Sequence, residues 1–83
     1  MEKNFFDIDE ELAHYLKLIS LNIAYYRKKK GLTQEKLAEV VGISRTYLSK
    51  IEAPNLPASL SLNTLFAIAE ALDVEPAKLL ELH

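Results

Sequence analysis

The feature of the sequence that most limits the possible folds is a pair of short helix patterns within residues 33–51 with almost no chain between them. Gly42 ends the first pattern, and Ile43 alone separates it from Ser44, a residue type that caps helix N-termini. Helices joined by about three or four residues cannot pack antiparallel, so they must cross at a steep angle. Ala38 is small enough for the close approach of crossed helices, and Gly42 can adopt the positive φ that the turn needs. The segment therefore predicts two short, steeply crossed helices.

Large apolar residues are spaced to anchor these two helices in a core. In the first helix they follow the helical period, and in the second they recur three residues apart. This spacing, together with the small residue and the glycine of the turn, is that of a helix-turn-helix motif over residues 33–52. The side chains expected to point inward are Leu37, Ala38, Val41, Ile43, Leu48 and Ile51.

The rest of the chain also has helical apolar spacing, and no stretch alternates with the period of a strand. Asp9 is the expected cap of a helix over residues 10–30, and Ser61 caps another over residues 62–72. Pro76 begins a short last helix. The apolar residues that these helices are built around or carry are Leu12, Leu16, Ile19, Ile23, Tyr26, Leu62, Leu65, Phe66, Ile68, Ala69, Leu72, Leu79, Leu80 and Leu82.

These patterns predict an all-α fold, a compact arrangement of five helices whose first helix is extended at its N-terminal end. We assign residues 1–18 to this extension and residues 19–83 to the folded domain. With 83 residues and no cysteine, the chain is expected to form one small core without disulfides or cysteine-based metal sites. No apolar stretch is long enough to cross a membrane and the first residues lack a signal-peptide pattern, so a cytoplasmic location is expected.

Charge is distributed unevenly along the sequence. The formal net charge is −2, but residues 13–50 carry eight basic and two acidic side chains, whereas each flanking segment carries five acidic and one basic. A phosphate backbone responds to the field within a Debye length of about 8–10 Å, so the basic middle matters more than the sum. Such segregation also occurs in proteins that bind no nucleic acid, so charge alone leaves the partner open.

The middle of the sequence resembles the lambda-repressor and Cro-like (XRE-type) helix-turn-helix family of bacterial and phage regulators. The resemblance extends over residues 19–82 and is carried by Lys30-Gly31-Leu32-Thr33-Gln34, Leu37-Ala38, Gly42-Ile43-Ser44 and Ile51-Glu52. It implies a compact DNA-binding domain that works as a homodimer on a palindromic double-stranded site. The function it implies is that of a sequence-specific transcriptional regulator that represses by occupying its operator.

The second helix of the motif is the one expected to read DNA, because in such motifs it lies in the major groove with its N-terminal residues facing the base edges. With the inward positions set aside, the predicted base-reading residues are Arg45, Thr46 and Ser49. Arg45 can bond guanine O6 and N7 together, and the two hydroxyl residues are short enough to reach the groove floor.

Contacts with the DNA backbone are predicted around the starts of both motif helices. Gln34 matches the family glutamine that bonds a phosphate and braces the reading side chain, and Lys50 can pair with a phosphate. Thr33 and Ser44 would serve as N-caps whether or not DNA binds, and a solvated helix end is the alternative for Arg27. The full set expected at phosphates or sugars is Thr33, Gln34, Ser44, Tyr47, Lys50 and Arg27.

Two segments depart from the family pattern. The loop over residues 53–60 is longer than usual and carries no positive charge, so it offers no cation to a phosphate. The long first helix has a second apolar line, which usually means that a second surface must be covered. The residues of this line and of the segment before it are Leu18, Leu21, Tyr25, Phe5, Phe6 and Ile8, which either fold back onto the domain or bind a partner.

Several alternatives for partner and function remain open. The homodimer is expected to form through Leu79, Leu80 and Leu82 of the last helix or through the N-terminal segment. The alternative function is a protein-interaction module of the same fold, antitoxin-like or accessory, with weak or no DNA binding. No nucleophile–base pair or phosphate-binding glycine loop can be assembled, so no enzyme, catalytic residue or cofactor is expected. His14 and His83 lack partners at ligand spacing, so no metal site is predicted.

Overall fold

A computed structural model describes residues 10–53 and 60–81 of the chain. These residues form four α-helices and one short 3-10 helix, with no strand among them: α1 (Glu10–Lys29), α2 (Gln34–Val41), α3 (Arg45–Glu52), α4 (Leu62–Ala71) and η1 (Pro76–Leu80). The predicted all-α fold is confirmed. The prediction of a fifth α-helix is wrong, because five residues that begin with a proline are too few to build an i→i+4 ladder and form a tighter 3-10 turn.

Some predicted features lie outside the described residues, and nothing in the structure tests them. They are the Asp9 cap, the apolar residues Phe5, Phe6 and Ile8, the loop over residues 54–59, and Leu82 and His83.

The helix boundaries follow the caps that the sequence predicts. Thr33 Oγ1 accepts a hydrogen bond from the backbone N–H of Lys36 at 3.0 Å, and Ser44 Oγ accepts one from the N–H of Tyr47 at 3.0 Å. The side chain of Ser61 caps α4 in the same way. Each cap satisfies a donor that the first turn of a helix would otherwise leave unpaired, so these three helices begin where a hydroxyl residue stands.

The core collects one face from every helix. Leu37 and Leu48 are fully buried, and Ala38 is only 2% exposed, which agrees with its predicted place between the crossed helices. Val41 and Ile43 are half-buried and pack against this core. The buried apolar residues are Ile23, Leu37, Ala38, Leu48, Ile51, Leu65, Ile68, Ala69, Leu72 and Leu79.

Two residues of α4 that were predicted to be inside are outside. Leu62 is 67% exposed and Phe66 is 49% exposed. At 100° per residue both lie more than a quarter turn away from the fully buried Ile68, on a side of α4 that the other described helices leave exposed. The apolar pattern of α4 is therefore wider than the face that the fold buries.

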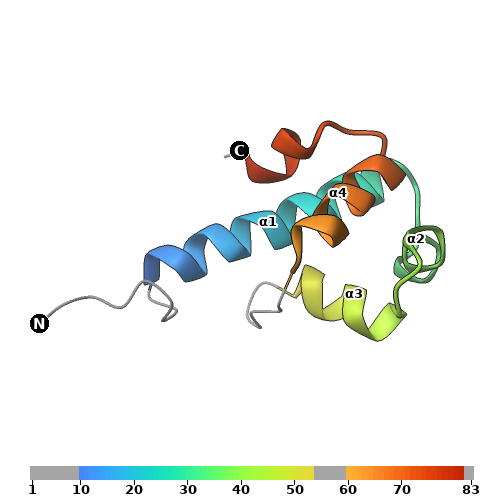
Figure 1. Ribbon diagram of the computed structural model, residues 1–83, viewed down its shortest axis with the longest axis horizontal. Coiled ribbons are helices and arrows are strands. Elements are labelled where there is room, and N and C mark those ends of the chain that lie inside the picture. The colour runs from blue at the N-terminus through green and yellow to red at the C-terminus, as the bar shows by residue number, and fades with distance from the viewer. Residues whose placement is uncertain (1–9, 54–59, 82–83) are drawn as a thin grey trace, which may run out of the picture.

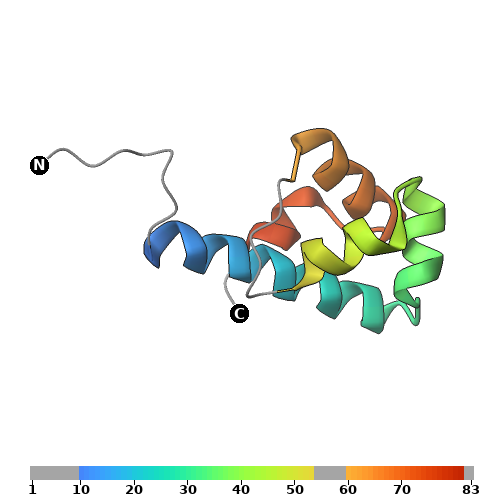
Figure 2. The same cartoon turned by 90° about the horizontal axis from the view of Figure 1, so that it is seen from below.

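The long helix α1 supports the whole arrangement. It contacts α3 and η1, while α2 contacts α3 and α4. In both views the N-terminal half of α1 projects beyond the other helices (Figures 1 and 2). The C-terminal segment is attached to α1 by Asn22, which is 1% exposed and whose Nδ2 donates to the backbone carbonyls of Leu79 and Glu81 at 2.9 Å each.

The prediction that Leu79 forms part of a dimer contact is wrong. The side chain of Leu79 is fully buried in the core of its own domain, so it cannot form an interface with a second subunit. Leu80, the next residue, is 53% exposed. Of the predicted dimer contacts on η1, only Leu80 is available within the described residues.

Candidate nucleic-acid interface

The outward face of α3 carries the predicted reading residues. α2 and α3 cross steeply (Figures 1 and 2), and the inner face of α3 is held in the core by Leu48 and Ile51, which are 0% and 3% exposed. Since the inner face is fixed, the opposite face must point to solvent. The exposed residues of α3 are Arg45, Thr46, Ser49 and Lys50.

The two N-caps border this face. The hydroxyl oxygens of Thr33 and Ser44 accept backbone hydrogen bonds, and each hydroxyl still has its own hydrogen to donate. Tyr47, one turn into α3, is half-buried and packs against the core. Exposed backbone N–H groups at helix starts bind phosphates, so the beginnings of α2 and α3 form a suitable border for a DNA backbone.

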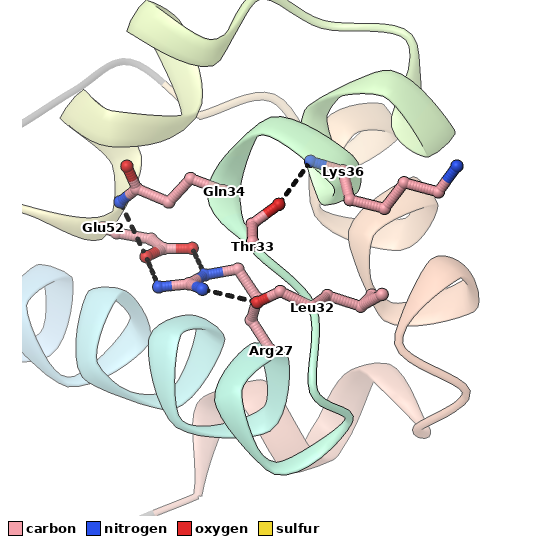
Figure 3. A network of polar contacts seen from close by, with 6 residues as sticks. All are labelled: Arg27, Leu32, Thr33, Gln34, Lys36 and Glu52. Atoms are coloured by element: carbon pink, nitrogen blue, oxygen red, sulfur yellow. Dashed lines mark hydrogen bonds and ion pairs between the residues drawn. The ribbon is translucent and has the colours of Figure 1, made fainter.

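Arg27 is available neither for the predicted phosphate contact nor for the alternative, a solvated helix end. Arg27 is 8% exposed, and its Nε and Nη2 donate to Glu52 Oε2 at 2.7 Å and Oε1 at 3.0 Å. Its Nη1 donates to the backbone carbonyl of Leu32 at 2.7 Å (Figure 3). We therefore withdraw the phosphate contact predicted for Arg27, because all three of its nitrogens are engaged inside the protein.

Gln34 joins the same network from α2. Its Nε2 donates to Glu52 Oε1 at 3.0 Å, so this carboxylate accepts hydrogen bonds from α1 and from the start of α2 (Figure 3). Glu52 is 8% exposed and stands at the end of α3. The network thus connects α1, α2 and the C-terminal end of α3.

Sequence reasoning assigned no role to Glu52 and the wrong one to Arg27. One signal was present: Arg27 lies four residues after the core residue Ile23, and Glu52 lies four residues after the core residue Leu48. Positions four apart share a helix face, so both charges belong to the buried stripes of their helices. Two opposite charges on buried stripes are most readily explained as a pair.

The cations of the α3 face are available to a ligand. Arg45 and Lys50 form no ion pair with any described residue. Lys36 on α2, by contrast, forms an ion pair in which its Nζ lies 3.7 Å from Oε1 of Glu39. The described part of the chain contains no group of three acidic or histidine side chains placed to hold a metal ion. Nor does it contain a helix long and apolar enough to cross a membrane.

The fold and this face define a helix-turn-helix protein, and comparison with known sequences agrees. The family model described as Helix-turn-helix matches residues 23–79, and the chain belongs to this family. The predicted membership in a helix-turn-helix family is therefore confirmed.

Individual relatives can be compared over most of the chain. The control protein C.SmaI of Serratia marcescens is 38% identical over 76 residues, which is 92% of this chain and 80% of that protein. The transcriptional regulator SinR of Bacillus subtilis is 39% identical over 64 residues, 77% of this chain, so the chain spans only 57% of the length of that protein.

Solved structures show the same fold. The restriction-modification controller protein C.AhdI of Aeromonas hydrophila superposes with a TM-score of 0.72 at 34% identity, over 81% of this chain and 97% of that one. A structure of SinR, the master regulator for biofilm formation, in complex with DNA gives a TM-score of 0.70 at 40% identity, over 76% of this chain and 98% of that one.

Proposed function

We propose that this protein is a transcriptional regulator that binds a specific double-stranded DNA sequence through α3. The observation that carries the proposal is the exposed face of α3, whose cations Arg45 and Lys50 form no ion pair with another described residue. The opposite face of this helix is held in the core by Leu48 and Ile51. The names of its relatives, which are control proteins and transcriptional regulators, support the same function.

The proposed mode of binding places α3 in the major groove. Arg45 bonds a guanine through O6 and N7, and Thr46 and Ser49 contact neighbouring bases. The phosphate contacts come from Lys50 and from the residues around the helix starts, which are Thr33, Gln34, Ser44 and Tyr47. A protein bound in this mode blocks other proteins from the operator, so we propose that it acts as a repressor. This action needs no catalytic residue, and we propose no enzymatic activity. We further propose that the protein acts in the cytoplasm.

Selection from a randomised duplex pool tests the proposal. The wild type should enrich a consensus, and Arg45→Ala should lose discrimination worth about 1–3 kcal/mol at one base pair of each half-site. Lys78→Ala is the control, because it removes one exposed positive charge from η1, which lies outside the proposed DNA-contacting surface. No enrichment by the wild type at low salt would refute DNA binding.

We also propose a homodimer on a palindromic site. Exposed apolar side chains on α4 and η1, namely Leu62, Phe66 and Leu80, support a subunit contact. A two-fold dimer would place its half-sites about 10–10.5 base pairs apart. Analytical ultracentrifugation should detect the dimer at micromolar concentration or on the selected duplex, and a monomer under both conditions would exclude it.

A second candidate function is a protein-interaction module. The outward side of α1 exposes Leu21 to 48% and Tyr25 to 51%, an apolar surface that DNA binding does not use. If the wild type enriches no duplex, this function takes precedence. Substitution of Leu21→Glu should then abolish capture of the partner, while Arg45→Ala should have no effect.

A further inference from the structure

Three side-chain nitrogens, two of Arg27 and one of Gln34, donate to the carboxylate of Glu52. Oε2 accepts from Arg27 Nε at 2.7 Å, and Oε1 accepts from Arg27 Nη2 and from Gln34 Nε2 at 3.0 Å each. The side chains of Arg27 and Glu52 are 10% and 5% exposed, so this arrangement is shielded from water. Because it links α1, α2 and α3, the position of Glu52 is fixed by the core.

The chemistry of Glu52 determines which way the Gln34 amide faces. An ionised carboxylate only accepts hydrogen bonds, so the amide must turn its nitrogen inward and its carbonyl oxygen away (Figure 3). The amide nitrogen has two hydrogens, and Glu52 uses one of them. The other N–H of Gln34 is thereby held in a fixed direction at the start of α2.

We propose that Glu52 is a positioning residue for DNA binding: it orients the Gln34 amide before DNA arrives, so that the remaining N–H meets a phosphate without reorganisation. The inference rests on the function proposed above. Ordering a long glutamine side chain on binding has an entropic cost, and a preset side chain avoids it.

Positioning by Glu52 and simple electrostatics predict opposite effects on DNA affinity when the charge of Glu52 is removed. Removal of a negative charge close to DNA ordinarily strengthens binding, because phosphates repel carboxylates. If Glu52 positions Gln34, its removal weakens binding instead. A charge-balanced variant separates the two effects most cleanly.

The double variant Arg27→Met/Glu52→Leu removes one positive and one negative charge and leaves the net charge unchanged. Replacement of a buried ion pair by apolar residues of similar size usually keeps a protein folded. Circular dichroism and thermal unfolding would verify the fold. We expect the affinity for the selected duplex to fall about tenfold, as for the loss of one hydrogen bond to a charged group.

A mutant cycle with Gln34→Ala then isolates the positioning effect. In the wild type Gln34→Ala should weaken DNA binding about tenfold. In the double variant it should change affinity by less than about twofold, because the amide is no longer oriented. An equal loss in both backgrounds, or wild-type affinity of the double variant, would overturn the inference while the proposed function stands. Absence of DNA binding by the wild type would overturn both.

A measurement on the free wild type covers the case in which the double variant does not fold. The side-chain amide of Gln34 should exchange its hydrogens more slowly in NMR spectra than the amide of the exposed Asn63 on α4. It should also show nuclear Overhauser contacts with the guanidinium of Arg27. Equal exchange rates for Gln34 and Asn63, with no such contacts, would show that the amide is not held and would overturn the inference.

Discussion

Two polar side chains of α1 hold other segments against it from within the core. Asn22 donates to the backbone carbonyl of Leu79 in η1 and to that of Glu81 directly after it. Arg27 donates to Glu52 and to the carbonyl of Leu32. Among the described residues, no buried side-chain nitrogen or oxygen lacks a hydrogen-bond partner. A buried polar group without a partner is costly, so each of these side chains allows only one placement of the segment it contacts.

Replacement of Arg27 alone should therefore lower the stability of the fold, whereas its replacement together with Glu52 should be tolerated. We expect Arg27→Met to lower the free energy of unfolding by about 3–5 kcal/mol, because the substitution leaves the carboxylate of Glu52 buried without its cation. The double variant Arg27→Met/Glu52→Leu should recover most of this loss. Urea unfolding monitored by circular dichroism measures both. Equal stability of the single and double variants would contradict the prediction.

Among the described helices, α1, α2 and α4 are followed by left-handed turns, whereas α3 ends in extended backbone at Ala53. Gly31 follows α1 with φ +79°, Gly42 follows α2 with φ +88°, and Asp73 follows α4 with φ +59°. At Gly42 the backbone N–H groups of that residue and of Ile43 both donate to the carbonyl of Ala38, at 2.8 and 3.0 Å. These two hydrogen bonds to one carbonyl oxygen reverse the chain sharply and set the direction in which α3 leaves the turn.

Gly42→Ala should lower the free energy of unfolding by about 1 kcal/mol. A Cβ at this position would meet no atom within 4 Å, so the cause is the positive φ and not a clash. Asp73→Gly is the matched control. It should not lower stability, because glycine adopts the φ of 59° without the strain that a Cβ brings. Urea unfolding checks both, and a stable Gly42→Ala would show that the turn adapts.

At the scale of the whole molecule, the net charge of −2 is a poor guide to its behaviour toward DNA. Most of the basic side chains lie in α1, α2 and α3, and the proposed interface contains Arg45 and Lys50, while several acidic ones lie in α4 and after it. DNA interacts mainly with the charges near its contact surface, because salt screens charges that lie more than about 8–10 Å away.

Binding should accordingly weaken with salt despite the negative net charge. Each phosphate contact contributes about 0.9 to the slope of log affinity against log salt, so Lys50→Ala should reduce the slope by about 1. Lys78→Ala removes a charge from η1 and should leave the slope unchanged. Fluorescence anisotropy at several salt concentrations measures these slopes. An identical slope for Lys50→Ala and the wild type would remove Lys50 from the phosphate contacts.

The sequence by itself determined the starts of α2, α3 and α4, the stop at Gly42 and the inward residues of the motif. Thr33, Ser44 and Ser61 cap helices through hydrogen bonds to residues three positions away, so the signal and its effect lie in the same short stretch of chain. The exposed face of α3 could be predicted in the same way, because burial of Leu48 and Ile51 leaves only the other side of the helix for solvent.

Only the tertiary structure decided which further side chains are inside. Arg27 and Leu79 are buried and Phe66 is exposed because of the neighbours that cover each position, and those neighbours come from elsewhere in the chain. The clearest case is Glu52, whose partners Arg27 and Gln34 lie 25 and 18 residues away. A sequence pattern records the period of one helix, whereas the pairing of charges depends on how separate helices pack together.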